Sequence, residues 1–250
     1  MCTKGKMKYY SLIFILFIFS GCDVSKISDL DTKNLAKLKV KILIEDGDKD
    51  NSLNYIKVFL TDGKKQIINA DIKILLNDSP LDLYVKNELY YTKKSFYRTD
   101  SLLRKDSYYF EIILPDSTKY PLAFIKPLKD SQSVKFNLPE SISLNEDFVL
   151  QWENLNTPYE LDIVKGTEIK VKRAPNITET AHAGRRIDTL KTKAGELIIP
   201  KSYFKDSLTF TRYLKIELNG KENGLINPQL LKSSNILFNH KIEKTIHFED

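Results

Sequence analysis

The stretch LKVKILIE at residues 38–45 decides the fold class of this chain. Apolar residues at the even positions from 38 to 44 alternate with Lys39 and Lys41, until Leu43 interrupts the pattern. Apolar and polar residues that alternate with a period of two are typical of a β-strand that buries one face. The sequence therefore predicts a half-buried strand at 38–44.

The rest of the chain repeats this pattern in short segments that end at turn residues. We predict further strands at 55–61, 67–68, 72–76, 90–91, 95–98, 108–114, 120–125, 134–138, 148–152, 161–163, 169–171, 197–199, 208–210, 213–218 and 236–248. The clearest of them, 108–114, ends at Pro115-Asp116. No stretch longer than ten residues carries a convincing helical stripe, and strands at this spacing favour an all-β sandwich or barrel.

The polar segment at 127–133 predicts a boundary between two domains, at 38–128 and 134–250. Two pieces of the first domain, ADIKILLND (70–78) and RKDSYYFEIILPD (104–116), resemble the Ig-like or transthyretin-like β-sandwiches of Bacteroidota lipoproteins. In the second domain, DFVLQWEN (147–154) resembles a strand of an immunoglobulin or fibronectin domain. The resemblance implies two tandem β-sandwiches, with Trp152 between the sheets of the second.

The first 22 residues carry a different pattern. Three lysines precede an apolar run from Leu12 to Phe19, and small residues follow it. Eight residues rise only about 12 Å as a helix, which is too short for a hydrocarbon core of about 30 Å. This combination predicts a signal peptide that is removed after export.

The end of that segment, Phe19-Ser20-Gly21-Cys22, resembles a bacterial lipobox, with Phe19 in the position where leucine is common. The resemblance implies export by the general secretory route, cleavage after residue 21 and acylation of Cys22, with palmitate among the acyl chains. The mature protein would then be a lipoprotein of the cell envelope, anchored through Cys22, and we expect it at the outer membrane. The alternatives are an ordinary secretory signal or a buried apolar strand. Residues 22–37 read as the lipidated end and a flexible tether.

Charge and cysteine content exclude several functions. Loss of Lys4, Lys6 and Lys8 leaves 36 basic residues of 39 against 33 acidic ones, so the formal net charge falls from +6 to +3. This charge does not indicate a nucleic-acid partner. Cys2 would leave with the signal and Cys22 would carry lipid, so the mature fold has no disulfide and no cysteine metal site. We expect no cofactor.

Two segments could bind a ligand. Residues 90–98, YYTKKSFYR, interleave aromatic residues with cations, and Tyr97 and Arg98 could stack sugar rings and hold anionic groups. The alternative is a sandwich strand with tyrosine at its rim and lysine protecting an edge. The acidic stretch 46–51 imitates a calcium loop but has Asn51 at its sixth position, so a turn is favoured.

The second candidate lies in residues 173–195, which show no apolar periodicity and are predicted to form the longest surface loop. His182, Arg185 and Arg186 lie there, and two guanidinium groups can clamp a carboxylate or phosphate. The alternative is a solvated loop without a ligand.

Sequence motifs for catalysis are missing: there is no HExxH, GxSxG or phosphate-binding glycine loop. We therefore expect a non-enzymatic, lipid-anchored binding or scaffold protein with an envelope protein or a glycan as partner. One alternative is a structural or adhesion subunit of the fimbrillin type, which also combines a lipobox with two sandwiches. The other is an envelope hydrolase that uses two carboxylates brought together by folding.

Overall fold

The computed structural model describes residues 35–47, 54–62, 65–87, 93–100, 105–128, 134–138, 143, 145–155, 158–170, 178–203 and 210–248. The side chains of 168–189 and of residue 210 are not part of this description. The predicted signal peptide (1–21), Cys22 and most of the tether therefore lie outside the described residues.

The described chain is almost entirely β-structure, which confirms the predicted all-β class. The strands are β1 (Leu38–Gly47), β2 (Tyr55–Asp62), β3 (Lys65–Gln66), β4 (Lys73–Leu76), β5 (Ser79–Pro80), β6 (Asp82–Asn87), β7 (Lys93–Thr99), β8 (Tyr108–Ile113), β9 (Lys119–Ile125), β10 (Lys135–Asn137), β11 (Phe148–Glu153), β12 (Tyr159–Lys170), β13 (Thr178–Leu190), β14 (Gly195–Ile199), β15 (Phe210–Asn223), β16 (Leu225–Ile226) and β17 (Asn235–His247). Two short 3₁₀ helices are η1 (Leu35–Lys37) and η3 (Lys201–Tyr203). Within these ranges, no helix has the length and apolar character needed to cross a bilayer.

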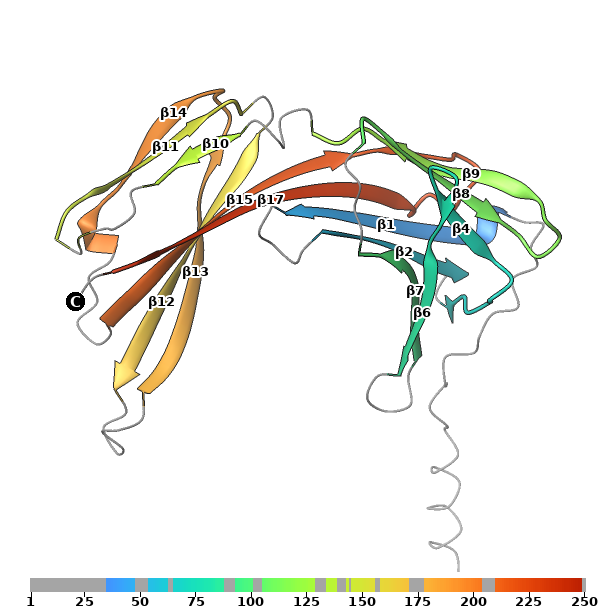
Figure 1. Cartoon of the computed structure of the whole chain (residues 1–250), viewed down its shortest axis with the longest axis horizontal. Helices are drawn as coiled ribbons and strands as arrows, with labels where there is room; N and C mark the ends of the chain where they lie inside the picture. Colours follow the sequence, from blue (N-terminus) through green and yellow to red (C-terminus); the bar gives the residue numbers. More distant parts are fainter. Residues whose placement is uncertain are drawn as a thin grey trace, which may run out of the picture.

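The strands form three sheets. The large sheet has the order β13-β12-β15-β17-β1-β2-β7-β6, with β3 beside β2. A five-stranded sheet has the order β16-β9-β8-β4-β5, and a three-stranded sheet has the order β10-β11-β14. The large sheet is bent like an arch, and the two smaller sheets cover its two ends on the same side (Figure 1). We call this covered side, which packs against the smaller sheets, the inner face of the large sheet. The opposite side, which no described element covers in Figure 1, is its outer face.

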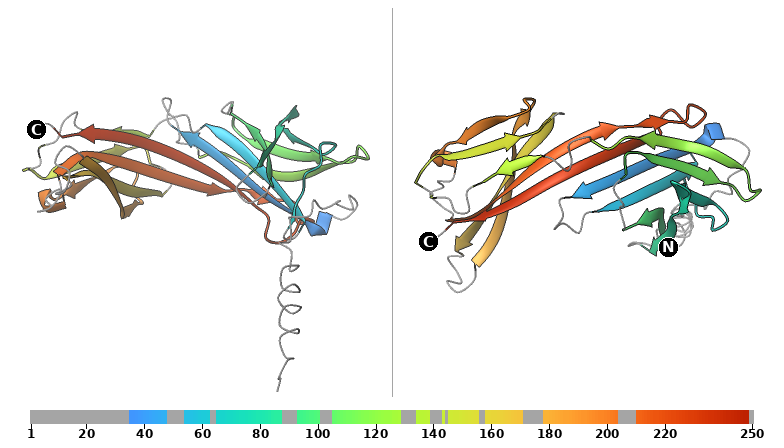
Figure 2. Two further views of the ribbon diagram at one scale, coloured as in Figure 1. Left: turned by 90° about the horizontal axis from the view of Figure 1, so that it is seen from below. Right: turned by 45° about the horizontal axis from the view of Figure 1, so that its top comes forward.

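Two long strands, β15 and β17, run from one end of the arch toward the other (Figure 2). β17 is antiparallel to β15 along one side and parallel to β1 along the other, where Lys41–Gly47 pair with Asn235–Lys241. Its even-numbered residues are buried from Ile236 to Ile242, and again at Ile246. One strand therefore contributes to the packing beneath both smaller sheets.

The alternation in the sequence forms the core of both ends. β1 buries Leu38, Val40, Ile42 and Ile44, as the opening stretch predicts, and β11 buries Phe148, Leu150 and Trp152. Trp152 is 6% exposed, and its Nε1 donates a hydrogen bond to the carbonyl oxygen of Thr192 at 3.1 Å. The predicted place of Trp152 in the core is confirmed.

Aromatic rings in the core pack over glycines on neighbouring strands. Trp152 pairs with Gly195 and Tyr159 pairs with Gly220. A Cβ atom at either glycine would lie 2.6 Å from the paired ring. A glycine in a strand often marks such a close approach, and here the missing side chain leaves room for the ring.

The predicted loop at 173–195 is wrong for residues 178–190, which form β13. This strand pairs with β12 at twelve positions and ends the large sheet. Backbone hydrogen bonds hold an edge strand, so it does not need apolar residues in alternation. Because β13 lacks that alternation, the sequence predicted a loop where the structure has a strand.

The predicted domain limits, 38–128 and 134–250, do not follow the sheets. Residues 225–226 pair with β9, and the first half of β17 pairs with β1. The backbone N–H of Leu231 also donates to the carbonyl oxygen of Leu38 at 3.0 Å. Part of the second predicted domain thus completes the first, and two separate domains remain a prediction.

Candidate functional site

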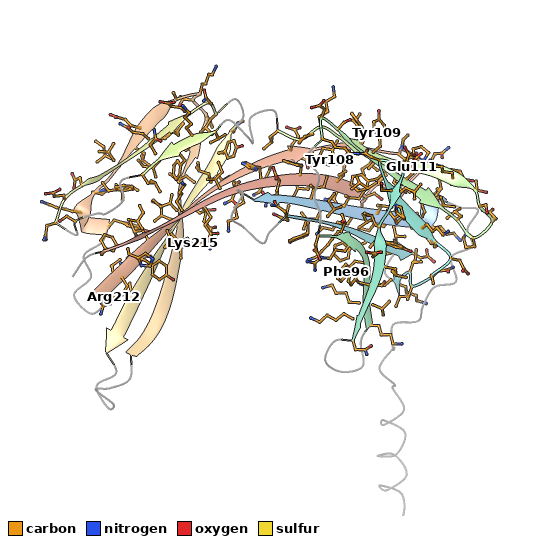
Figure 3. The ribbon with its side chains drawn as sticks, viewed as in Figure 1. Phe96, Tyr108, Tyr109, Glu111, Arg212 and Lys215 are labelled. Carbon is orange, nitrogen blue, oxygen red and sulfur yellow. The ribbon has the colours of Figure 1, made fainter. Side chains whose placement is uncertain are left out.

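Partly exposed side chains gather on the outer face of the large sheet. The odd-numbered residues of β1 and β2 point there, because the even-numbered ones are buried under the five-stranded sheet. Figure 3 labels Phe96 beneath β1 and β2, on the side away from Tyr108 and Tyr109 of the five-stranded sheet. No described element covers this face.

One part of this face is both basic and aromatic, and we call it the basic aromatic patch. Strand register places its members on one side: Lys41 lies opposite Phe59, Lys57 opposite Arg98, and Phe96 opposite Tyr84. The patch consists of Lys39 and Lys41 on β1, Tyr55, Lys57 and Phe59 on β2, Lys94, Phe96 and Arg98 on β7, and Tyr84 and Lys86 on β6.

Three aromatic rings form a row across the strands of the patch. The ring centroids of Phe59 and Phe96 are 5.7 Å apart with a tilt of 46°. Tyr84 stacks on Phe96 at 5.9 Å with only 10° between the ring planes, and Tyr84 is 43% exposed. The row therefore presents ring surface to solvent.

Cations of the patch lie against the rings of Tyr55 and Phe96. The Nζ of Lys57 is 4.1 Å from the ring centroid of Tyr55 and 5.6 Å from that of Phe96, and the guanidinium of Arg98 lies 5.4 Å from Tyr55. Burial lowers the pKa of Lys57, and the nearby charge of Arg98 lowers it further. Burial, with the charge of Glu45, raises the pKa of the Tyr55 hydroxyl.

The patch carries more positive than negative charge. Among the described residues, its six cations face three carboxylates at its margins, those of Glu45, Asp82 and Asp100. Asp100 forms an ion pair with Arg98, and Glu45 accepts a hydrogen bond from Asn239. The lysines therefore supply most of the surplus charge.

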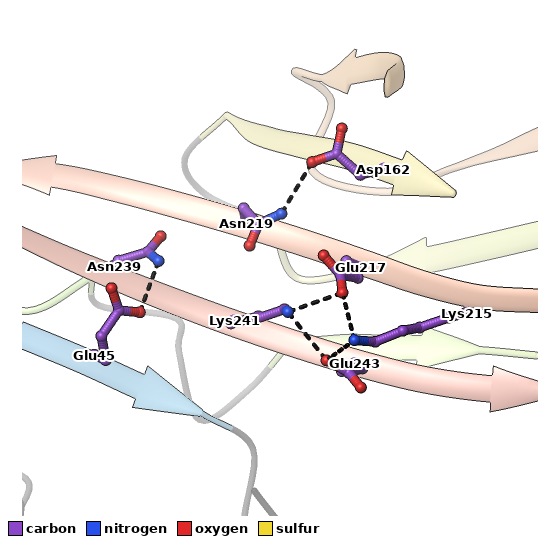
Figure 4. A network of polar contacts seen from close by, with 8 residues as sticks. All are labelled: Glu45, Asp162, Lys215, Glu217, Asn219, Asn239, Lys241 and Glu243. Atoms are coloured by element: carbon purple, nitrogen blue, oxygen red, sulfur yellow. Dashed lines mark hydrogen bonds and ion pairs between the residues drawn. The ribbon is translucent and has the colours of Figure 1, made fainter. Parts of the chain in front are cut away.

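The outer face continues over β15 and β17 as a network of neutralised charges (Figure 4). Lys215 lies 2.8 Å from Glu217 and 2.9 Å from Glu243, and Lys241 lies 2.9 and 3.0 Å from the same two carboxylates. Burial acts to raise the pKa of both glutamates, but hydrogen bonds from the two lysines outweigh it and lower these pKa values. We call these four residues the charge quartet.

A third polar group is buried between β1 and β17. Nδ1 of His240 and Oδ2 of Asp46 are 3.1 Å apart, and their side chains are 1% and 2% exposed. The Nε2 of His240 has no hydrogen-bond partner among the described residues. A carboxylate–histidine pair can serve general acid–base chemistry, but this one is closed to solvent.

The structure separates the residues that the sequence singled out. Tyr97 is 2% exposed and its hydroxyl donates to the carbonyl oxygen of Ile72 at 3.0 Å, so it packs in the core. Arg98, its neighbour, lies in the patch. His182, Arg185 and Arg186 lie on β13, opposite Gly166, Ile163 and Asp162 of β12.

The sequence interpretation missed the contributions of β2 and β6 to the patch. Tyr55, Lys57 and Phe59 are alternate residues of a predicted strand, so their common face was visible in the sequence. Their proximity to Phe96 was not, because strand pairing sets it. The calcium-like stretch at 46–51 lies partly outside the described residues. Its first carboxylate, that of Asp46, pairs with His240. The described residues contain no cluster suited to a metal ion.

Neither known protein-family models nor curated protein sequences contain a match to this chain. Its function must therefore be inferred from the chemistry of its own surface.

Proposed function

We propose that this chain is a non-enzymatic, lipid-anchored binding protein of the cell envelope, and that the basic aromatic patch is its binding surface. The observation that carries the proposal is the combination of a partly exposed aromatic row with surplus positive charge on a sheet face that no described element covers. Rings supply stacking area and cations supply charge-assisted hydrogen bonds, which together favour ligand binding.

The charge quartet helps to locate the site by contrast. Each of its lysines contacts two carboxylates, so an anionic ligand would have to displace existing partners. Among the described residues the patch has six cations and three carboxylates, so positive charge is in surplus there and an anionic ligand would be attracted. The same sheet face thus contains one region in which each lysine contacts two carboxylates and another, the patch, in which cations outnumber the described carboxylates.

Two observations favour binding over the alternatives. The carboxylate–histidine pair of Asp46 and His240 is almost completely buried, so a substrate cannot reach it as a hydrolase would require. A fimbrial subunit would donate or accept a strand, whereas β1 is paired on both sides, with β2 and with β17. Removal of β1 would open the middle of the large sheet.

The proposed anchor is compatible with an accessible patch. From Cys22 to Leu35 the chain has 14 residues, whose 13 Cα–Cα steps span at most about 45 Å when extended. The anchor itself is tested with Cys22→Ser, which should move the protein from the membrane fraction to the soluble fraction and abolish labelling by a palmitate analogue. A Cys22→Ser protein that still sediments with membranes would contradict the anchor.

The binding surface is tested with a matched pair of tyrosines. Tyr84→Ala removes an exposed ring that stacks on Phe96, and Tyr109→Ala removes a 55% exposed ring on β8 that packs on Phe124 at 4.6 Å. Residues 23–250 are applied to arrays of neutral and anionic glycans and to phosphatidylserine vesicles. Tyr84→Ala should weaken binding to at least one probe about tenfold, as for loss of a stacking ring, and Tyr109→Ala should not. Equal binding by the two variants, or no binding by the unmodified protein, would overturn the proposal.

A further inference from the structure

We infer that the ligand of the basic aromatic patch is an anionic polysaccharide, a chain of sugar rings that carry carboxylate or sulfate groups. This inference rests on the proposed function and specifies the ligand class for the same surface. It follows from how rings and cations are arranged on four neighbouring strands.

The aromatic row forms the centre of the patch. Phe59, Phe96 and Tyr84 lie on three adjacent strands, and neighbouring strands are about 4.8 Å apart. The apolar faces of sugar rings can stack on such a row. Because Tyr84 is 43% exposed and lies almost parallel to Phe96, the row offers a flat surface at its outer end.

Cations flank the aromatic row on both sides. Residues two positions apart on a strand share a face and lie about 6.7 Å apart. Lys57 and Arg98 are therefore one step from the rings in one direction along the strands, and Lys94 and Lys86 are one step away in the other. A sugar stacked on the row would direct its ring substituents toward these cations.

The spread of charge favours a polymer over a small anion. The six cations are distributed over β1, β2, β7 and β6, a width of about 14 Å. Five of them are lysines, which act as separate point charges, and Arg98 already holds Asp100. A single phosphate or carboxylate could contact only part of this set, whereas a chain with repeated anionic groups can contact all of it.

A lipid surface is the competing occupant. An anionic bilayer would attract the same lysines, and its interface also accepts aromatic rings. The stacked pair of Tyr84 and Phe96 leaves only Tyr84 exposed to enter a bilayer, whereas one exposed ring is enough to stack a sugar. The row of rings therefore favours a glycan, and the experiment includes vesicles to separate the two.

The experiment compares polygalacturonate with its methyl-esterified form, which has the same sugar backbone without the negative charge. The charge variant is Lys41→Glu with Lys86→Glu, and its matched control is Lys73→Glu with Lys126→Glu, which changes net charge equally at exposed positions outside the patch. Tyr84→Ala and Tyr109→Ala complete the set, and melting curves confirm that each variant is folded. Binding is measured by biolayer interferometry over a range of salt concentrations.

Polygalacturonate should bind, and both the charge variant and Tyr84→Ala should weaken it about tenfold or more, with the controls unchanged. Added salt should weaken binding, and less steeply in the charge variant. The esterified polymer could instead bind with the same affinity as polygalacturonate, and that binding could still depend on Tyr84. This result would overturn the anionic ligand but leave the proposed function intact. Loss of binding in the charge variant alone, or vesicle binding that does not depend on Tyr84, would also overturn the inference. No binding to any probe would reject both proposals.

Discussion

At the scale of single residues, Asp46 and His240 form a polar contact that is almost completely buried in the described core. The two residues are direct partners in the parallel register of β1 and β17, and His240 also faces Gly220 of β15. The ring of Tyr159 meets the imidazole edge-on, at 6.2 Å and 87°. A buried polar group lowers stability unless it is hydrogen-bonded, so each partner depends on the other.

Replacement of Asp46 by alanine should therefore destabilise the fold by about 1–3 kcal/mol, because it leaves the imidazole Nδ1 without its carboxylate. The measurement is urea unfolding of the Cys22→Ser protein. A double variant, Asp46→Leu with His240→Phe, removes both polar groups and should recover part of that loss. The single variants Asp46→Leu and His240→Phe are measured beside it. A double variant whose loss of stability equals the sum of their two losses would show that the pair contributes through separate contacts.

The residue scale also shows what sequence reasoning could find. The alternation FVLQW places Trp152 on the same side as Phe148 and Leu150, and all three are buried. The run of aromatics and cations at 90–98 includes β7, which contributes to the patch, but Tyr97 packs inward while Phe96 faces outward. Because side chains alternate along a strand, an error of one residue exchanges core and surface.

At the scale of elements, strands with a buried face were predictable and strand partners were not. β1, β8 and β11 follow the alternation in the sequence, whereas β13 lies at an edge and carries none. The parallel pairing of β1 with β17 joins residues 194 positions apart, as between Asp46 and His240. Local pattern contains no information about such a contact, and the patch depends on contacts of the same kind.

The charge quartet makes a prediction about acid stability. The pKa values of Glu217 and Glu243 are lower in the folded protein than their ordinary value of 4.5. The carboxylates therefore stabilise the fold above that value, and their contribution is lost as the pH falls through the folded pKa values. The unmodified protein should lose stability below about pH 5, and Glu217→Gln with Glu243→Gln should make that loss shallower.

Glu45 provides the control for this prediction, because burial raises its pKa. A raised carboxyl pKa has the opposite sign: its protonation favours the fold as the pH falls. Glu45→Gln should therefore make the loss of stability in acid steeper, not shallower. Both effects are measured as melting temperatures between about pH 3 and 7, a range that brackets the usual glutamate pKa. Parallel curves for the unmodified protein and the quartet variant would contradict the prediction.

At the scale of the whole molecule, β15 and β17 connect the two ends of the arch (Figure 2). Each smaller sheet packs against a different end of the large sheet, yet both ends share these strands. Buried residues from all three sheets belong to one continuous apolar cluster, including Phe110 on β8, Phe238 on β17 and Trp152 on β11. A shared sheet and a shared core favour unfolding as one cooperative unit.

This connection predicts a single unfolding transition in spite of the two-part appearance of the chain. Trp152 is the only tryptophan, so its fluorescence reports on the three-stranded sheet alone. Phe110→Ala alters the core beneath the five-stranded sheet, where Phe110 is 0% exposed, and should cost about 3–5 kcal/mol. If the molecule is one cooperative unit, that substitution should lower the midpoint of the Trp152 transition by roughly 10 °C, although it lies in the other half. Circular dichroism, which reports on all strands, should give the same midpoint. Two separated transitions, or a Trp152 midpoint that does not respond to Phe110→Ala, would show that the ends of the arch unfold independently despite the strands that join them.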